Sequence, residues 1–164
     1  MLDSGEADIT IGVQPTPTGR ILSRPLFDER FVCILRKDHP AAECELDLQS
    51  FLRLSHLLVL PENERFGVVD AALAKLGLKR RLVLTLPQMY AAPALIAFSD
   101  MTATVMAGVV TASGHADRLA VLKPPLELPR VQFLMSWASS KRHAPGATLV
   151  QKLYCGCGSR YLAR

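Results

Sequence analysis

The feature that most constrains the fold is the apolar run Phe31–Leu35 (FVCIL), which lies within the segment Leu26–Pro40. The acidic pair Asp28 and Glu29 precedes this run, and charged residues and a proline follow it. A short apolar run with such boundaries is typical of a β-strand that is buried on both faces. The run therefore predicts a core strand in a sheet that helices cover on both sides.

The rest of the chain alternates between strand patterns and helix patterns. Strands are predicted at 7–12, 56–60, 82–86, 101–105, 119–122 and 131–137, and helices at 48–54, 69–77, 87–99, 107–113 and from 145 to about 154. This alternation predicts an α/β fold in which a mixed or parallel sheet is flanked by helices. Ligands of such sheets bind beyond the carboxyl ends of the strands.

Local signals refine three of these helices. Asp47 is expected to cap the helix at 48–54, because its carboxylate can accept from backbone N–H groups of the first turn. Gly77 is expected to end the helix at 69–77. Helical spacing places Val69, Leu73 and Leu76, with Ala72, on one face of the first of the next two helices, and Ala92, Leu95, Ile96 and Ser99 on one face of the second. A mainly apolar helix face of this kind is expected to pack against the core.

Composition and charge indicate a globular protein without a dedicated nucleic-acid-binding face. Of the 164 residues, 49% are hydrophobic and 21% are charged, which is a balance typical of a folded domain. No apolar segment reaches the roughly 18–20 residues that cross a bilayer, and the acidic N-terminus lacks the apolar core of a secretory signal. We therefore expect no membrane contact and a cytoplasmic protein. The net charge is +4, and the basic residues lie in short clusters, which favours a solvated surface over DNA contact.

The four cysteines are Cys33, Cys44, Cys155 and Cys157. Cys155 and Cys157 form a C-x-C pair near His143, and these are residue types that bind zinc. A closed zinc site needs four ligands, usually with wider cysteine spacing, and no second pair follows in register. We therefore expect free thiols, no metal site and no cofactor.

The sequence lacks the common motifs of catalytic sites. It contains neither a G-x-S-x-G nucleophile elbow nor a glycine-rich phosphate loop. Cys33 and His56 form the one thiol–imidazole pair that a Cys/His hydrolase could use. His56, however, stands at the start of a predicted strand, where a structural role is more common. We expect that the chain is not an enzyme.

Six sequence segments, taken together, indicate a protein family more specifically than any one of them does alone. They are Ser4–Ile9 (SGEADI), Leu26–Pro40 (LFDERFVCILRKDHP), Val68–Arg81, Leu84–Pro87 (LTLP), Ser99–Val105 (SDMTATV) and Leu126–Trp137. In this order they resemble the C-terminal effector-binding domain of bacterial LysR-type transcriptional regulators, especially those of nodulation and aromatic catabolism. The resemblance implies a fold like that of type 2 periplasmic binding proteins, with a Rossmann-like second subdomain. It also implies that a small molecule binds in the cleft between two hinged subdomains.

The layout of that family divides the chain into three parts. Residues 1–25 would be a remnant of effector subdomain one, 26–140 subdomain two, and 141–164 a C-terminal segment that returns to subdomain one. The helix-turn-helix, the linker helix and the first half of subdomain one have no counterpart in this sequence. The chain therefore resembles an effector domain that is truncated at its N-terminus. DNA contact is expected only through a helix-turn-helix that is absent from this chain.

The resemblance also implies which residues line the cleft. The second subdomain would contribute Glu64, Arg65, Phe66, Gln88, Met89, Thr102 and Thr104, and a facing loop would contribute Gln14 and Pro15. Phe66 would stack on a flat ring, and Arg65 would pair with a carboxylate. Gln88 would both donate and accept hydrogen bonds, so the expected effector is aromatic or a carboxylate. In the alternative, Phe66 packs under its own helix and Arg65 is solvated.

Three functions remain open at this point. The leading one is effector binding and oligomerisation as part of a LysR-type regulator, with a homodimer as the assembly. The second is a dimerisation module that truncation has left independent of ligand and that pairs through exposed helices or an unpaired sheet edge. The third is a Cys/His hydrolase.

Overall fold

The structure, a computed structural model, describes residues 2, 7–13, 20–60 and 67–139. The chain divides into two compact units. Unit 1 consists of Met1–Glu29 with Val131–Arg164, and unit 2 consists of Arg30–Arg130. The assignment of residues 1–25, 26–140 and 141–164 to the subdomains of the family stays a prediction.

Unit 1 contains a three-stranded antiparallel sheet in the order β1–β8–β2. The strands are β1 (Ile9–Gly12), β2 (Ile21–Glu29) and the central β8 (Val131–Ala138). Phe27 and Phe133 are paired across β2 and β8, and their rings stack with centroids 4.9 Å apart. Cross-strand aromatic pairs of this kind stabilise an antiparallel pairing. The strand predicted at 131–137 is therefore confirmed as the centre of this sheet.

Unit 2 contains a five-stranded mixed sheet in the order β5–β4–β6–β3–β7. Its strands are β3 (Phe31–Arg36), β4 (Ser55–Val59), β5 (Arg81–Leu86), β6 (Met101–Met106) and β7 (Leu119–Leu122). β4 is parallel to both β5 and β6, whereas β3 is antiparallel to both β6 and β7. This arrangement confirms the predicted α/β fold with a mixed sheet.

The core strand predicted from the apolar run is β3. Cys33, Ile34 and Leu35 are 0% exposed, as expected for a strand that is covered on both faces. Alternate residues serve different cores, since Ile34 packs into one hydrophobic cluster and Cys33 into another. The sheet of unit 2 therefore separates two cores.

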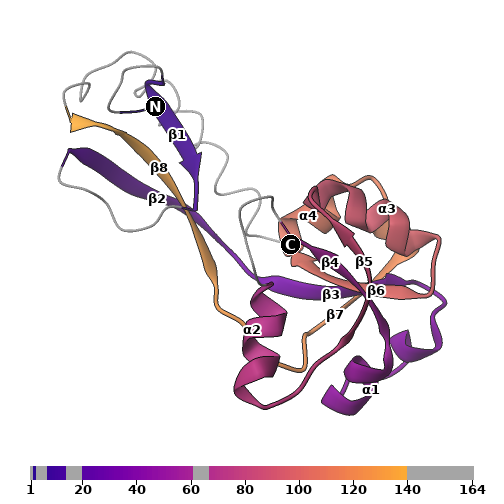
Figure 1. Cartoon of the computed structure of the whole chain (residues 1–164). Helices are drawn as coiled ribbons and strands as arrows, with labels where there is room; N and C mark the ends of the chain where they lie inside the picture. Colours follow the sequence, from indigo (N-terminus) through magenta and orange to yellow (C-terminus); the bar gives the residue numbers. More distant parts are fainter. Residues whose placement is uncertain (1, 3–6, 14–19, 61–66, 140–164) are drawn as a thin grey trace. The chain divides into compact units, whose positions relative to one another are not determined.

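Helices cover the two faces of this sheet in pairs (Figure 1). They are α1 (Leu48–Arg53), α2 (Val68–Lys75), α3 (Ala92–Ala97) and α4 (Ala107–Ala112), with short 3-10 helices η1 (Pro40–Ala42), η2 (Met89–Ala91) and η3 (Ala116–Arg118). We call α1 and α2 with the residues beneath them the α1/α2 layer, and α3 and α4 with theirs the α3/α4 layer. Phe51 and Leu73 belong to the core of the first layer, and Ile96 and Val110 to that of the second.

Two local predictions are confirmed and two are wrong. The Asp47 carboxylate accepts a 2.7 Å hydrogen bond from the Ser50 N–H at the start of α1, and Gly77 follows α2 with a φ of 68°. Leu76 and Leu95, predicted to be buried, are 57% and 39% exposed. α2 ends at Lys75, so Leu76 no longer follows the helical spacing. Within α3, Ala92, Pro93 and Ile96 are the buried residues, and Leu95 lies outside the buried face.

Within the described part of the chain, no helix combines the length and the hydrophobicity that crossing a bilayer requires.

Candidate functional site

The candidate site of unit 2 lies at the edge where the parallel strands end. Because β5 and β6 both run parallel to β4, the carboxyl ends of these three strands share one edge of the sheet. β3 begins at the same edge, where Phe31 pairs with Met106 and the Ala107 N–H donates to the Arg30 carbonyl at 2.9 Å. Ligands of open α/β sheets bind at such an edge. We call it the carboxyl edge.

Gln88 and Met89 follow β5 directly and therefore lie next to the carboxyl edge. The side chain of Gln88 is exposed and makes no capping hydrogen bond to η2, so its amide is available to a ligand. Met89 is half-buried and packs against the core of the α3/α4 layer. Of the two predicted residues, Gln88 has the geometry of a ligand contact, whereas Met89 supports the core.

The two predicted threonines lie on β6 and both serve the sheet. Thr102 is 0% exposed, and its hydroxyl donates a 3.1 Å hydrogen bond to the Ile34 carbonyl. It stands at the amino end of β6, opposite His56, and not at the carboxyl edge. Thr104 is half-buried, with its hydroxyl oxygen 3.5 Å from the Cys33 sulfur. This placement favours a structural role for Thr102 and leaves Thr104 nearer the edge.

Five of the predicted site residues lie outside the described residues. They are Gln14, Pro15, Glu64, Arg65 and Phe66. Their roles in effector binding stay predictions.

A buried ion pair fixes the start of α2 beside the carboxyl edge. The guanidinium of Arg80 donates two hydrogen bonds to the Asp70 carboxylate, from Nε at 2.8 Å and from Nη2 at 2.7 Å. The Arg80 side chain is only 2% exposed. At Gly67, the residue before α2, an added Cβ would lie 2.7 Å from both Asp70 Oδ2 and a methyl carbon of Leu58. A larger residue at position 67 would therefore force the ends of the Asp70 and Leu58 side chains to shift.

The buried ion pair, which we call the Asp70–Arg80 clamp, was not predicted from the sequence. Asp70 in the first turn of a helix and Arg80 after that helix were visible in the sequence, but their pairing depends on how the helix packs. A glycine at the predicted helix start was the one local signal, because a close backbone approach is a common reason for glycine.

Cys33 and His56 do not form a nucleophile and its base. Burial raises the pKa of the Cys33 thiol to about 11, so the thiolate that would attack a substrate is disfavoured. His56 is 0% exposed, and its Nε2 donates to the Phe51 carbonyl at 2.7 Å. Burial lowers the pKa of His56 to about 4. The geometry therefore gives the hydrolase hypothesis no support.

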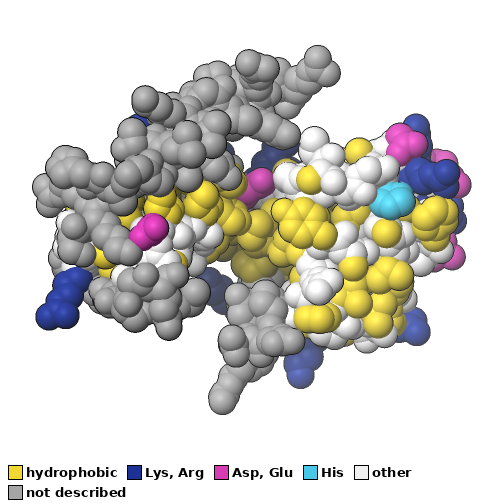
Figure 2. Space-filling model, turned by 90° about the horizontal axis from the view of Figure 1, so that it is seen from above, with side chains coloured by type: hydrophobic (Ala, Val, Ile, Leu, Met, Phe, Trp, Pro, Cys, Tyr) yellow, Lys and Arg dark blue, Asp and Glu magenta, His cyan; other side chains and the backbone are white. Residues whose placement is uncertain are grey.

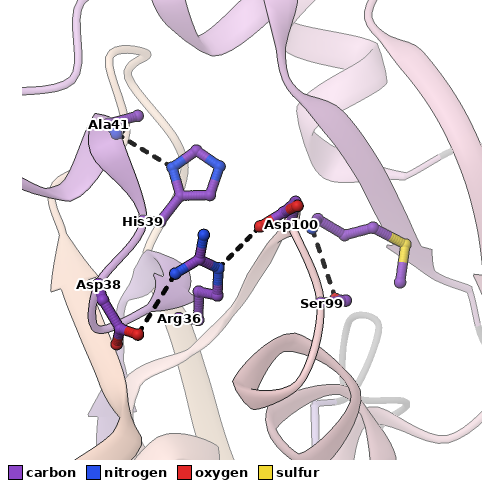
Figure 3. Close-up of polar contacts among 7 residues, drawn as sticks. Arg36, Asp38, His39, Ala41, Ser99 and Asp100 are labelled. Atoms are coloured by element: carbon purple, nitrogen blue, oxygen red, sulfur yellow. Dashed lines mark hydrogen bonds and ion pairs between the residues drawn. The ribbon is translucent and has the colours of Figure 1, made fainter.

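A second group of polar residues braces the opposite edge of the sheet, where β3 ends and β6 begins (Figure 3). Arg36 Nε lies 2.7 Å from Asp100 Oδ1, and Arg36 Nη1 lies 3.4 Å from Asp38 Oδ2. The hydrogen bond from Arg36 lowers the pKa of Asp100. His39 accepts a hydrogen bond from the Ala41 N–H. Within the described ranges, no cluster of His, Cys, Asp or Glu could hold a metal ion, and Cys155 and Cys157 lie outside them.

A family model described as the LysR substrate binding domain matches residues 1–153. The chain belongs to the LysR substrate-binding domain family. The HTH-type transcriptional activator NagR of Ralstonia sp is 30% identical over 93% of this chain and 51% of its own length. The crystal structure of the probable transcriptional regulator PA0477 from Pseudomonas aeruginosa has a TM-score of 0.78 at 30% identity, with 92% of this chain and 50% of that chain covered. The effector-binding domain of QuiR in complex with shikimate has a TM-score of 0.72 at 15% identity, with 98% and 76% covered.

These similarities confirm the family that the sequence motifs predicted. This LysR domain spans about half the length of NagR and of PA0477. The relatives are regulators of transcription and not enzymes, as the sequence led us to expect.

Two further surface features occur on unit 2 of the LysR domain. Figure 2 shows hydrophobic side chains gathered on one face of unit 2, near a histidine and basic side chains. Tyr90 and Phe98 are 69% and 70% exposed, and the Arg118 guanidinium lies 5.2 Å from the centre of the Phe98 ring. A groove of about 470 Å³ lies between the segments 45–47 and 123–127. The groove includes no residue that the family resemblance assigned to the effector, whereas Tyr90 directly follows the predicted site residues Gln88 and Met89.

Proposed function

We propose that this LysR domain binds a small-molecule effector, a carboxylate or an aromatic compound, at the carboxyl edge of unit 2. The observation that carries the proposal is the shared carboxyl end of β4, β5 and β6, with the exposed amide of Gln88 beside it. The Asp70–Arg80 clamp supports it, since a fixed helix start gives a ligand a preorganised wall. QuiR, whose effector domain has this fold, was solved with the carboxylate shikimate.

Roles within the proposed site follow from the chemistry of the side chains. Gln88 would hydrogen-bond a hydroxyl or carboxylate of the effector. Arg65 would pair with a carboxylate and Phe66 would stack on a ring. Gln14 and Pro15 would complete the contacts. Thr104 would contribute its hydroxyl, whereas Thr102 would hold the sheet together.

A thermal-shift experiment tests the proposal with shikimate, benzoate and salicylate as probes. A ligand that binds only the folded state adds about 2.7 kcal/mol at a concentration of 100 times its Kd, which raises the Tm of a chain of this size by roughly 5–10 °C. Gln88→Ala should reduce the shift, whereas Gln49→Ala, which alters an exposed glutamine on α1, should leave it unchanged. The proposal fails if no probe raises the Tm, or if both variants respond as the unaltered chain does.

The edge strand β5 favours dimerisation as a second candidate function. Among the described strands β5 pairs only with β4, and Leu82, Val83 and Leu84 are 45%, 44% and 37% exposed. An exposed apolar edge can pair with another strand. Light scattering would support this function if the chain is a dimer with and without the probes and Val83→Lys makes it monomeric. A monomer at all concentrations would exclude it.

We further propose that the chain acts as the sensing part of a longer bacterial regulator in the cytoplasm. NagR, which is described as an HTH-type activator, is about twice as long as the matched segment. DNA contact would then come from a helix-turn-helix outside this sequence.

A further inference from the structure

The α1/α2 layer contains a buried histidine whose protonation state the geometry fixes. The Phe51 carbonyl can only accept a hydrogen bond, so Nε2 of His56 must carry a hydrogen and donate it across the 2.7 Å separation. The neutral ring then leaves Nδ1 without a hydrogen. Nδ1 is buried and has no hydrogen-bond partner among the described residues. A proton on Nδ1 would therefore enter a buried position without a hydrogen-bond acceptor among the described residues.

Burial is the largest influence on the charge of His56 and disfavours it, whereas the hydrogen bond to Phe51 favours the charge to a smaller extent. The two charged neighbours act in opposite directions: the Arg80 guanidinium disfavours a positive charge on His56, and the Asp70 carboxylate that pairs with Arg80 favours it. Cys33, another buried titratable side chain of this layer, is a neutral thiol because burial raises its pKa. The neutral ring is thus the state that fits the closed layer.

The ring also connects α1 with β4, the next element along the chain. Its hydrogen bond ties the last turn of α1 to the first residues of β4, and it packs edge-on against the Phe51 ring with centroids 4.5 Å apart. Phe51 is fully buried in the cluster that includes Val69 and Leu73 of α2. A charged His56 can reach water only if α1 and α2 move away from the sheet.

The α3/α4 layer has no comparable group among its described residues. The buried polar or charged side chains of unit 2 are His56, Arg80 and Thr102. All three lie on the α1/α2 side of the sheet, since Thr102 alternates along β6 with Ala103 of the opposite core. We propose that His56 is an acid-sensitive latch: acidification opens the α1/α2 layer of unit 2 while the α3/α4 layer stays closed.

The direction and size of the effect follow from proton linkage. The pKa of His56 is about 4 in the closed layer and returns to its ordinary value of 6.5 when the layer opens. The open state therefore binds one more proton between these two pH values. The opening equilibrium constant should rise by about tenfold per pH unit in this window, or about 300-fold in total. Above pH 6.5 His56 should contribute no pH dependence.

Hydrogen exchange of the complete chain at pH 7 and pH 5, corrected for intrinsic exchange rates, tests the latch. Amides of α1 and α2 should lose protection by about 30-fold at pH 5, and those of α3 and α4 should keep theirs. His56→Gln should abolish the difference, because its amide can donate to Phe51 and does not titrate. His115→Gln, which alters a partly exposed histidine, is the matched control and should retain the difference.

Three outcomes would overturn the proposal. They are an equal loss of protection in both layers at pH 5, no response in either layer, and a His56→Gln variant that behaves as the unaltered chain does. Should His56→Gln fail to fold, nitrogen NMR of the imidazole in the unaltered chain decides the matter. A neutral ring protonated on Nε2 at pH 5 in the closed state supports the latch, and a ring that is charged at pH 5 without loss of protection refutes it.

Discussion

The two layers of unit 2 bury similar apolar cores against the same sheet but differ in what else they bury. The α3/α4 layer is filled by aliphatic side chains such as Ile34, Leu57 and Ile96. The α1/α2 layer contains His56 and the Arg80 side chain beside its apolar cluster. Its stability therefore depends on hydrogen bonds and on charge compensation as well as on packing.

Because of this difference, the two layers should tolerate substitutions of their buried side chains to different degrees. Apolar packing tolerates small changes in side-chain shape, whereas a buried charge without its partner costs several kcal/mol. Helix α2 of the polar layer begins beside the carboxyl edge, and α4 of the other layer begins there as well. Directional interactions thus position the part of the carboxyl edge that lies beside α2.

The largest expected effect comes from breaking the buried ion pair. Asp70→Ala leaves the Arg80 guanidinium buried and unpaired, so we expect unfolding free energy to fall by about 3–5 kcal/mol in urea titrations. Asp38→Ala removes an exposed partner of Arg36 and should cause no measurable loss. Combining Asp70→Leu with Arg80→Met should recover much of the stability. If Asp70→Ala and Asp38→Ala cost the same, the contrast between the layers is wrong.

A single methyl group should disturb the same layer by a smaller amount. The Cβ of Gly67→Ala would lie 2.7 Å from Asp70 Oδ2 and from Leu58, and such overpacking costs about 1–3 kcal/mol. Gly12→Ala is the control, because an added Cβ there meets nothing within 4 Å. Thermal unfolding of both variants measures the difference. Equal Tm values for the two variants would show that the start of α2 adapts freely.

Sequence patterns predicted the elements of the fold better than the faces of its helices. The apolar run at β3 and the cap at Asp47 were predicted correctly, because each depends on residues that are close in the sequence. The exposure of Leu76 and Leu95 was missed, because it depends on where a helix ends or begins, and this is settled by packing against the sheet.

The candidate site could be predicted only in part for the same reason. The position of Gln88 after a parallel strand follows from the alternation of strands and helices. The position of Thr102 at the amino end of β6 follows from the predicted strand at 101–105, but its hydrogen bond to Ile34 depends on strand register, which the sequence alone does not specify. The Asp70–Arg80 clamp and the Phe51–His56 bond likewise join elements whose contact arises only after packing.

The smallest expected effect tests whether the packing of the α3/α4 layer is independent of pH. Ile96 is fully buried there, so Ile96→Val should lower the unfolding free energy by about 0.5–1.5 kcal/mol through the loss of one methylene group. Because no described titratable side chain is buried in this layer, the loss should be the same at pH 7 and at pH 5. Urea titrations at both pH values measure it. If Ile96→Val loses more unfolding free energy at pH 5 than at pH 7, opening of the α1/α2 layer also loosens the packing of α3. The two cores would then not respond to pH independently.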